Sequence, residues 1–354
     1  MEYRFFGDTG IKVSAISFGN MTFGGGEMFV HAGNQQLAEA KQFVDTLIDA
    51  GVNLIDTADV YSMGLAEDIL GQAMDAKKRD KLLIATKCHF RMSDEINDVG
   101  QSRHHIIRAC EASLKRLRTD YIDIYQVHNF DSLTNLEQTM RALDDLVRAG
   151  KVRYIGCSNL PAWAIMKANG IADKRNLEKF VSLQSYYSII ARELEHEFVP
   201  MCEDQKMAIL VWGPLAGGFL SGKYEKGKAA DSSTRRAHWG DYGYIDEDYG
   251  FGVVDVLKQI GKERNISTSQ VALNYLLQKK GITSLIIGAS KIEQLKDSLK
   301  AADWKLTTEE MNRLDKVSDL PKPYPYWHHY RFNQERMPLQ KEQAPEAELV
   351  ASKK

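Results

Sequence analysis

Short runs of apolar and β-branched residues alternate along this chain with longer segments in which apolar residues recur every three or four positions. Runs of the first kind are typical of β-strands, and segments of the second kind are typical of amphipathic helices. The runs are apolar more than alternating, as expected of strands that are covered on both faces. Eight strands are predicted, at residues 15–18, 52–56, 82–86, 121–127, 152–157, 180–184, 208–212 and 285–287.

Helical spacing is clear in the segments between these strands. Phe43, Leu47 and Ile48 are followed by Gly51, a typical helix end, and residues 106–117 and 136–149 have the same spacing. A strand followed by a helix, repeated around the chain, predicts an α/β fold of the (β/α)₈ TIM-barrel type. A doubly wound dinucleotide-binding sheet is the weaker alternative, because the glycines at 24–26 do not have the G-x-G-x-x-G spacing.

Length decides between one domain and two. A chain of 354 residues, divided by roughly 150 per domain, suggests two domains. A TIM barrel takes about 250 residues, so we expect one barrel over 1–320, with a long loop at 223–250 after the seventh strand. An aromatic C-terminal loop and tail are expected at 321–354. The aromatic start of this segment is expected to pack against another part of the protein. Its charged last part, from Gln340 onward, is expected to be mobile.

Composition excludes several classes of protein. The net charge is −2 with both signs interspersed, which gives no reason to expect binding to nucleic acid or to a membrane surface. The first residues are charged, and no apolar run is long enough to span a bilayer, so a cytoplasmic protein is expected. The four cysteines lack metal-type spacing and are expected to be reduced thiols.

Polar and aromatic residues end or directly follow seven of the predicted strands. In a barrel of this type the strand ends converge on the active site, so these residues are expected at one face. Any one of them alone is more often a structural ion pair or a core residue, but together they indicate a site. They are Asp56 with the following 57–61, Lys87, His128, Ser158 with Asn159, Gln184, Trp212 and residues 288–291.

Four of these residues form a set suited to proton transfer: Asp56, Tyr61, Lys87 and His128. A tyrosine has a pKa near 10 in model peptides, and a neighbouring ammonium lowers that pKa by favouring the phenolate. A carboxylate keeps such a lysine charged, and an imidazole can hydrogen-bond a substrate oxygen or share the phenolic proton. No serine or cysteine has a clear base partner and G-x-S-x-G is absent, so proton donation to an oxygen is the expected chemistry.

The same residues lie in runs that resemble the aldo-keto reductases. The matches cover about residues 3–317, in the family's order, and the W-x-P-L after the seventh strand favours the branch of aryl-alcohol dehydrogenases and potassium-channel β-subunits. The runs are G-V-N-L-I-D-T-A-D-V-Y at 51–61, A-T-K at 85–87, Q-V-H at 126–128, G-K-V-R-Y-I-G-C-S-N at 150–159, L-V-W-G-P-L-A-G-G-F-L-S-G-K-Y at 210–224 and I-I-G-A-S-K-I-E-Q-L at 286–295.

The resemblance implies an NADP(H)-dependent carbonyl reductase. Tyr61 would be the general acid, tuned by Lys87 and Asp56, and His128 would orient the carbonyl. It further implies nicotinamide contacts from the ends of strands five to seven, a pyrophosphate loop at 213–223 and adenosine contacts after strand eight. The implied cofactor residues are Asn20, Met21, Asp56, Ser158, Asn159, Gln184, Trp212, Gly213, Leu215, Gly217, Lys223, Arg236, Gly288, Ser290, Lys291, Gln294 and Asp297.

The chain departs from the family pattern at three points. Gly213 replaces a serine, Ser298 stands where asparagine is common, and Ser290 stands where a basic residue is frequent. The 2′-phosphate contact would then rest on Ser290 and Lys291, helped by Arg235 or Arg236. Charged hydrogen bonds of this kind contribute about 1.5–3 kcal/mol, so a preference for NADPH over NADH is expected.

The substrate and two other functions stay open. Met21, Phe23, Tyr61, His89, Phe90 and the aromatic tail are expected to line the pocket, which favours an aromatic or apolar aldehyde. A redox-sensing module that binds NADP and regulates a partner is the first alternative function. A metal-dependent hydrolase using His104-His105 or His328-His329 is the second, but adjacent histidines diverge on a helix and rarely share one metal. The oligomeric state is left open.

Overall fold

The computed structural model describes residues 1–26, 29, 31–228, 231, 236–237 and 245–333. Contacts between Cα atoms divide the chain into two compact units, Met1–Val317 and Ser318–Lys354. Within the second unit, helix α13 (Tyr326–Phe332) occupies part of the segment expected to form an aromatic loop. The tail residues 334–354, expected to be mobile, lie outside the described residues.

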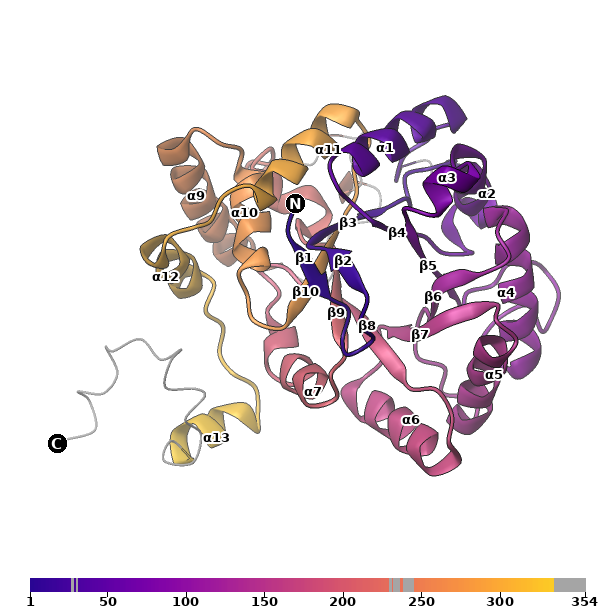
Figure 1. The fold of residues 1–354 in the computed structure, drawn as a ribbon. Helices are drawn as coiled ribbons and strands as arrows, with labels where there is room; N and C mark the ends of the chain where they lie inside the picture. Colours follow the sequence, from indigo (N-terminus) through magenta and orange to yellow (C-terminus); the bar gives the residue numbers. More distant parts are fainter. Residues whose placement is uncertain (27–28, 30, 229–230, 232–235, 238–244, 334–354) are drawn as a thin grey trace. The chain divides into compact units, whose positions relative to one another are not determined.

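Eight parallel strands of the first unit close into a barrel, as the sequence predicts (Figure 1). Their order around the barrel follows the chain, and β10 pairs with both β3 and β9 to close the ring. The strands are β3 (Ile16–Gly19), β4 (Leu54–Asp56), β5 (Leu83–Cys88), β6 (Ile122–Val127), β7 (Val152–Ser158), β8 (Phe180–Tyr186), β9 (Ala208–Trp212) and β10 (Ile282–Ile287). The doubly wound alternative is therefore wrong.

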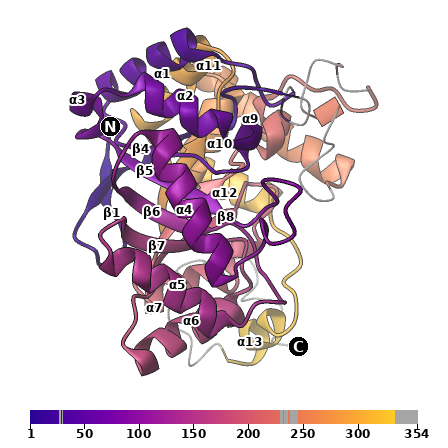
Figure 2. The same cartoon turned by 90° about the vertical axis from the view of Figure 1, so that its right-hand side faces the viewer.

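Helices surround the barrel (Figure 2). Ser102 caps α4 and Asn135 caps α5, each by accepting a hydrogen bond from a backbone N–H of the first turn. Gly51, with φ +78°, follows α1 at the predicted end. The helices are α1 (Leu37–Asp49), α2 (Leu65–Ala73), α3 (Ala76–Arg79), α4 (Arg103–Leu117), α5 (Leu136–Arg148), α6 (Ala162–Arg175), α7 (Phe198–Asp204), α9 (Glu247–Arg264), α10 (Thr268–Leu277), α11 (Ile292–Leu299) and α12 (Thr308–Val317).

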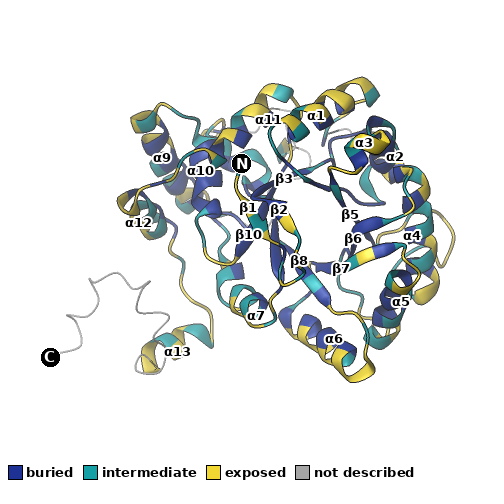
Figure 3. Cartoon of the chain, viewed as in Figure 1, coloured by how far each residue is buried: buried dark blue, intermediate teal, exposed yellow. Residues whose placement is uncertain are grey.

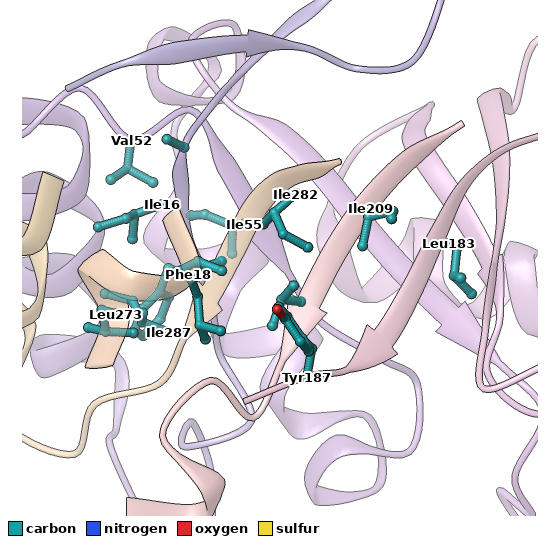
Figure 4. Close-up of a cluster of buried hydrophobic side chains, with 14 of the residues drawn as sticks. Ile16, Phe18, Val52, Ile55, Leu183, Tyr187, Ile209, Leu273, Ile282 and Ile287 are labelled. Atoms are coloured by element: carbon teal, nitrogen blue, oxygen red, sulfur yellow. The ribbon is translucent and has the colours of Figure 1, made fainter. Parts of the chain in front are cut away.

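Two apolar clusters hold the barrel together. The larger one fills the layer between strands and helices, where the inward faces of the helices are buried (Figure 3). Phe18 of β3, Ile287 of β10 and Leu273 of α10 belong to this layer (Figure 4). The smaller cluster lies inside the barrel and joins Leu54, Ala85, Ile124, Leu210 and Ile286 with residues of the N-terminal segment.

An N-terminal hairpin, which the sequence analysis did not predict, closes the barrel at one end. Strands β1 (Tyr3–Phe5) and β2 (Lys12–Ser14) pair in antiparallel fashion. Phe6 and Val13 are fully buried against the apolar residues of the barrel interior. Each strand is only three residues long and has polar neighbours, so the apolar pattern gives little sign of it.

The inward-facing residues change from apolar to polar toward the other end of the barrel. Side chains alternate between the two faces of a strand, so residues two apart point the same way. Leu54, Ala85 and Ile124 lie in the apolar interior, and two positions further along the same strands stand Asp56, Lys87 and Gln126. All of these polar residues are buried. The polar layer is therefore at the carboxyl ends of the strands, where a barrel of this type carries its active site.

Some predicted boundaries are wrong by a few residues. Strand β5 continues to Cys88, so Lys87 lies inside it, and β10 begins three residues earlier than predicted, at Ile282. The end of the expected loop 223–250 belongs to α9, which begins at Glu247 with Asp246 as its cap. Arg235 lies outside the described residues. Within the described part of the chain, no helix is both long and apolar enough to cross a membrane.

Candidate active site

Lys87 connects the predicted proton-transfer residues. Its Nζ lies 2.6 Å from Asp56 Oδ1, 2.7 Å from the carbonyl oxygen of Thr57 and 3.3 Å from Tyr61 Oη. The side chains of Lys87 and Asp56 are 0% and 3% exposed. An ammonium in a site this dry interacts strongly with both oxygens. The structure therefore brings together Asp56, Tyr61 and Lys87, which the sequence singled out.

Burial and charge act in opposite directions on this pair. Burial by itself would lower the pKa of Lys87, but the attraction of Asp56, together with Tyr61, outweighs it and raises that pKa. Burial raises the pKa of the Asp56 carboxyl, while Lys87 and the hydrogen bonds from Gln184 and Gln126 oppose the rise. Lys87 is thus held as an ammonium next to the phenol.

Tyr61 begins a tight turn with unusual backbone angles. Ser62 and Met63, with φ +50° and +54°, and Gly64, with φ +91°, are all left-handed. Such a conformation costs a non-glycine residue roughly 1–2 kcal/mol. The Ser62 hydroxyl donates to the carbonyl oxygen of Phe23 at 2.9 Å and accepts from the Gly25 N–H at 3.1 Å. These bonds hold the strained turn that presents Tyr61.

His128 lies across from Tyr61, with the two rings 5.9 Å apart and nearly perpendicular. Burial, Lys87 and His89 hold the pKa of His128 well below its usual range, so the imidazole is neutral. Its Nδ1 is buried and has no hydrogen-bond partner among the described residues. The backbone oxygen of His128 accepts from Asn159 Nδ2 at 3.0 Å. The fourth predicted residue therefore joins the set as an uncharged group.

Aromatic rings surround Tyr61 and His128. Phe29 lies 6.2 Å from the Tyr61 ring, and Phe90 lies 4.9 Å from His128 and 5.1 Å from His89. Phe90 is 38% exposed and His89 is half-buried, so both side chains are partly accessible from outside. Phe23, which we expected in the pocket, is fully buried between Phe18 and Phe43. That assignment is wrong, because the apolar pattern did not separate the core from the pocket.

The sequence of this chain matches a known protein family and several of its members. The model of the aldo/keto reductase family matches residues 15–319 of the chain. The chain belongs to the aldo/keto reductase family. Versiconal hemiacetal acetate reductase from Aspergillus parasiticus is 33% identical over 340 residues, which cover 89% of this chain and 96% of that protein.

Two further relatives place the chain within the family. A Schizosaccharomyces pombe protein with the assigned name of an aryl-alcohol dehydrogenase is 33% identical over 339 residues, 88% of this chain and 94% of its own. An Arabidopsis thaliana protein named as a voltage-gated potassium channel subunit beta is 35% identical over 312 residues, 86% and 92% of the two chains. The predicted branch is confirmed. Aldo/keto reductases carry out oxidation and reduction at carbonyl groups and generally bind NAD(P)H.

The residues expected to contact the nicotinamide form a connected group. Asn159 Nδ2 donates to Ser158 Oγ at 3.0 Å, and Asn159 Oδ1 accepts from Trp212 Nε1 at 3.1 Å. Gln184 Nε2 donates to Asp56 Oδ2 at 2.7 Å. The ring of Tyr186, which the sequence analysis missed, packs 4.8 Å from Trp212. The end of the barrel that carries Asp56 is thus connected to the expected nicotinamide pocket.

The segment after β9 has a backbone suited to a phosphate. Gly213, Ala216, Gly217 and Gly218 have φ of +67°, +49°, +65° and +93°, and Leu215 lies between them. Turns of this kind can form an anion-binding concavity. Two of the N–H groups are used within the turn, since Ala216 donates to the Gly213 carbonyl oxygen at 2.8 Å and Gly218 to that of Leu215 at 2.9 Å. Lys223 is exposed, and its Nζ lies 3.5 Å from the point where a Cβ on Gly218 would be. The lysine and the glycine backbone suit a pyrophosphate.

The expected adenosine end is at the start of α11. Ser290 and Lys291 are exposed there, and the amide oxygen of Gln294 accepts from the N–H and the hydroxyl of Ser290, both at 3.1 Å. Gly288 is exposed after β10. Asp297, in contrast, accepts from Ser267 and Gln270 of the α10 start, each at 2.6 Å.

Three other expected cofactor residues lie in different surroundings. Asn20 is buried, with its Oδ1 unpartnered among the described residues, which leaves an acceptor for a ligand. Met21, next to it, is half-buried. The guanidinium of Arg236 lies 3.8 Å from Glu247 and 4.9 Å from the Phe219 ring. A phosphate contact by Arg236 would therefore compete with Glu247.

The metal alternative has no support in the described residues. No three or more His, Cys, Asp or Glu side chains among them are grouped to hold a metal ion. His105 is buried against Asp98, 3.2 Å away, whereas His104 is exposed beside Arg108. The two imidazoles therefore face different surroundings, as expected of neighbours on a helix.

Proposed function

We propose that this chain reduces aldehydes or ketones to alcohols with NADPH, and oxidises alcohols in the reverse direction. The observation that supports this most is the position of Lys87, whose ammonium contacts both Asp56 and the Tyr61 hydroxyl in a buried layer. This arrangement suits the delivery of a proton to an oxygen that gains electrons. The bound cofactor supplies the hydride to the carbonyl carbon.

In this proposal Tyr61 is the proton donor. Loss of its proton leaves a phenolate, which the Lys87 ammonium at 3.3 Å stabilises. Asp56 keeps that ammonium in place and charged through the 2.6 Å ion pair. Because the left-handed turn at Ser62 fixes the start of the loop, the phenol is positioned before the substrate arrives.

His128 orients the carbonyl in this proposal. A neutral imidazole can donate an N–H to the carbonyl oxygen without placing a second positive charge beside Lys87. The low pKa of His128, which results from burial, Lys87 and His89, supports this uncharged role. Phe29, Phe90 and His89 give the surroundings an aromatic character, which suits an aromatic or apolar aldehyde.

The cofactor would lie along the strand ends from β7 to β10. Ser158, Asn159, Gln184 and Trp212 would face the nicotinamide, and the 213–223 segment the pyrophosphate. Lys291 and Ser290 would hold the 2′-phosphate, since both are exposed and Lys291 has no ion pair among the described residues. A placed lysine is worth about tenfold or more in the preference for NADPH.

Steady-state kinetics tests this proposal. We expect kcat/KM with NADPH to exceed that with NADH at least tenfold. With NADPH, kcat/KM for aryl aldehydes should exceed that for sugar aldehydes. Lys291→Met should reduce the preference and leave kcat with NADH unchanged. Equal efficiency with both cofactors would contradict the NADPH assignment, and activity on sugars alone would contradict the apolar substrate.

A redox-sensing module is the second candidate function. The relative named as a potassium channel subunit beta supports it, because that name describes a regulatory subunit. The two candidates differ in turnover, since a sensor needs to bind the cofactor but needs no rapid release of alcohol. Multiple turnovers of NADPH per chain with an aryl aldehyde would favour the reductase, and a single turnover would favour the sensor.

A further inference from the structure

We propose that Gln126 is a positioning residue that holds the Asp56 carboxylate toward Lys87 and thereby maintains the Asp56, Lys87 and Tyr61 set. The inference rests on the proposed reductase function. The proposed function assigns no role to Gln126. This residue is fully buried in the polar layer of the barrel. Its partner in register on β5 is Lys87.

The hydrogen bonds to Asp56 are divided between its two oxygens. Oδ1 accepts from Lys87 Nζ at 2.6 Å. Oδ2 accepts from Gln184 Nε2 at 2.7 Å and, over a longer distance of 3.4 Å, from Gln126 Nε2. The two amides hold one oxygen while the ammonium holds the other. The plane of the carboxylate is therefore fixed from both sides, which directs Oδ1 at Lys87.

The second amide is needed because Gln184 has another expected task. Gln184 stands near the end of β8 among the residues proposed to face the nicotinamide. If the Gln184 amide serves the cofactor instead, Gln126 is the remaining amide donor on Asp56 Oδ2. Gln126 lies deeper than His128, which follows the end of β6. On the same face of β6, Ile124 already belongs to the apolar interior.

The buried side chain of Gln126 lowers the stability of the folded barrel. Gln126 Oε1 is buried and has no hydrogen-bond partner among the described residues, and an unpaired buried polar atom costs about 1–3 kcal/mol. Gly156 makes room for it, because a Cβ there would lie 3.1 Å from Gln126 Cγ and 2.4 Å from Ser182 Oγ. A leucine at 126 would avoid the unpaired oxygen, but it has no N–H group to donate to Asp56.

Charged and titratable groups around Asp56 determine what its loss would do. Lys87 faces Asp56 directly, and Tyr61, His128 and Asp59 interact with Lys87 from the neighbouring loops and strand. Burial raises the pKa of Asp56, and the amide donors act against that rise. Without the Gln126 donor the pKa of Asp56 rises further. The carboxylate, and with it the ion pair to Lys87, is then lost at a higher pH.

Two substitutions and one control test the inference. In Gln126→Leu we expect the acid limb of the kcat profile for NADPH-dependent reduction to move up by about 0.5–1 pH unit. Gln126→Glu, which adds a carboxyl group beside Asp56, should move it further. Ser182→Ala removes a buried polar atom across Gly156 that does not touch Asp56, and should leave the limb unchanged. If Gln126→Leu does not fold, Gln126→Met carries the same expectation.

A titration that needs no turnover separates this inference from the proposed function. The Asp56 carboxyl resonance in protein labelled with ¹³C-aspartate, identified by its loss in Asp56→Asn, should titrate at higher pH in Gln126→Leu than in the unsubstituted protein. A shift without any reductase activity would contradict the function and keep the inference. Reductase activity with an unshifted resonance and an unshifted acid limb would overturn the inference.

Discussion

Lys87 Nζ lies 2.6 Å from Asp56 Oδ1, and neither side chain is more than 3% exposed. An ion pair this deeply buried contributes little net stability, because the desolvation of both charges offsets their attraction. Breaking it is costly, since one charge then remains in a dry site. The pair is best explained by what it does for Tyr61, whose hydroxyl is the next neighbour of the ammonium.

Lys87→Met should destabilise the protein by about 3–5 kcal/mol, because it leaves the Asp56 carboxyl buried without its counterion. Adding Asp56→Asn should recover most of that stability but none of the reductase activity. Urea unfolding of the two single variants and the double variant measures the coupling. A Lys87→Met protein as stable as the unsubstituted chain would show that water reaches Asp56 and replaces its counterion.

The turn after Tyr61 gives a second prediction. Ser62→Ala loses two hydrogen bonds and keeps the left-handed strain, whereas Ser62→Gly loses the bonds and relieves the strain. We expect kcat to fall about ten- to a hundredfold in both, while Ser62→Gly is the more stable. Cofactor affinity should not change. Thermal unfolding compares the stability of the two variants, and single-turnover experiments compare their rates of reduction.

Met63→Asn is the matched control for that turn. Met63 has the same left-handed backbone as Ser62 but is 52% exposed, and asparagine tolerates this conformation. Its kcat should stay within about twofold, since Tyr61 keeps its contacts. A loss of kcat as large as that of Ser62→Ala would mean that the turn, rather than the hydroxyl of Ser62, positions Tyr61.

The structure explains why a glycine stands at position 213, where the family pattern has a serine. A Cβ at this position would lie 2.9 Å from two ring carbons of Tyr186, in a backbone with φ +67°. Gly213→Ser, which restores the common residue, should therefore destabilise the protein by about 1–3 kcal/mol and weaken cofactor binding. Gly227→Ser is the control, because φ there is +73° but nothing lies within 4 Å. Equal stability of the two variants would rule out the clash.

The sequence predicts the barrel well because each of its strands is rich in apolar residues, most of them buried. The strand ends then locate Asp56, Lys87 and His128 without knowledge of any distance. Strands β1 and β2 escape the same analysis, since a three-residue strand with one buried face has no distinct pattern.

The missed site residues share a different reason. Gln126 belongs to the Q-V-H run that resembles the family, but it lies inside a strand, where only its neighbours show what its amide contacts. Tyr186 follows the predicted strand end by two residues. A search for polar residues two positions before His128 would have singled out Gln126. The left-handed turn at Ser62 and Met63 has no sequence signal at all, because neither residue type favours it.

Tyr61→Phe tests the central claim most directly. The variant keeps the ring beside His128 and removes only the hydroxyl that Lys87 contacts. We expect kcat for aldehyde reduction to fall by about 10²–10⁴, while the dissociation constant for NADPH, measured by fluorescence titration, stays within about twofold. Unchanged reduction by Tyr61→Phe would show that the proton comes from another group and would contradict this account.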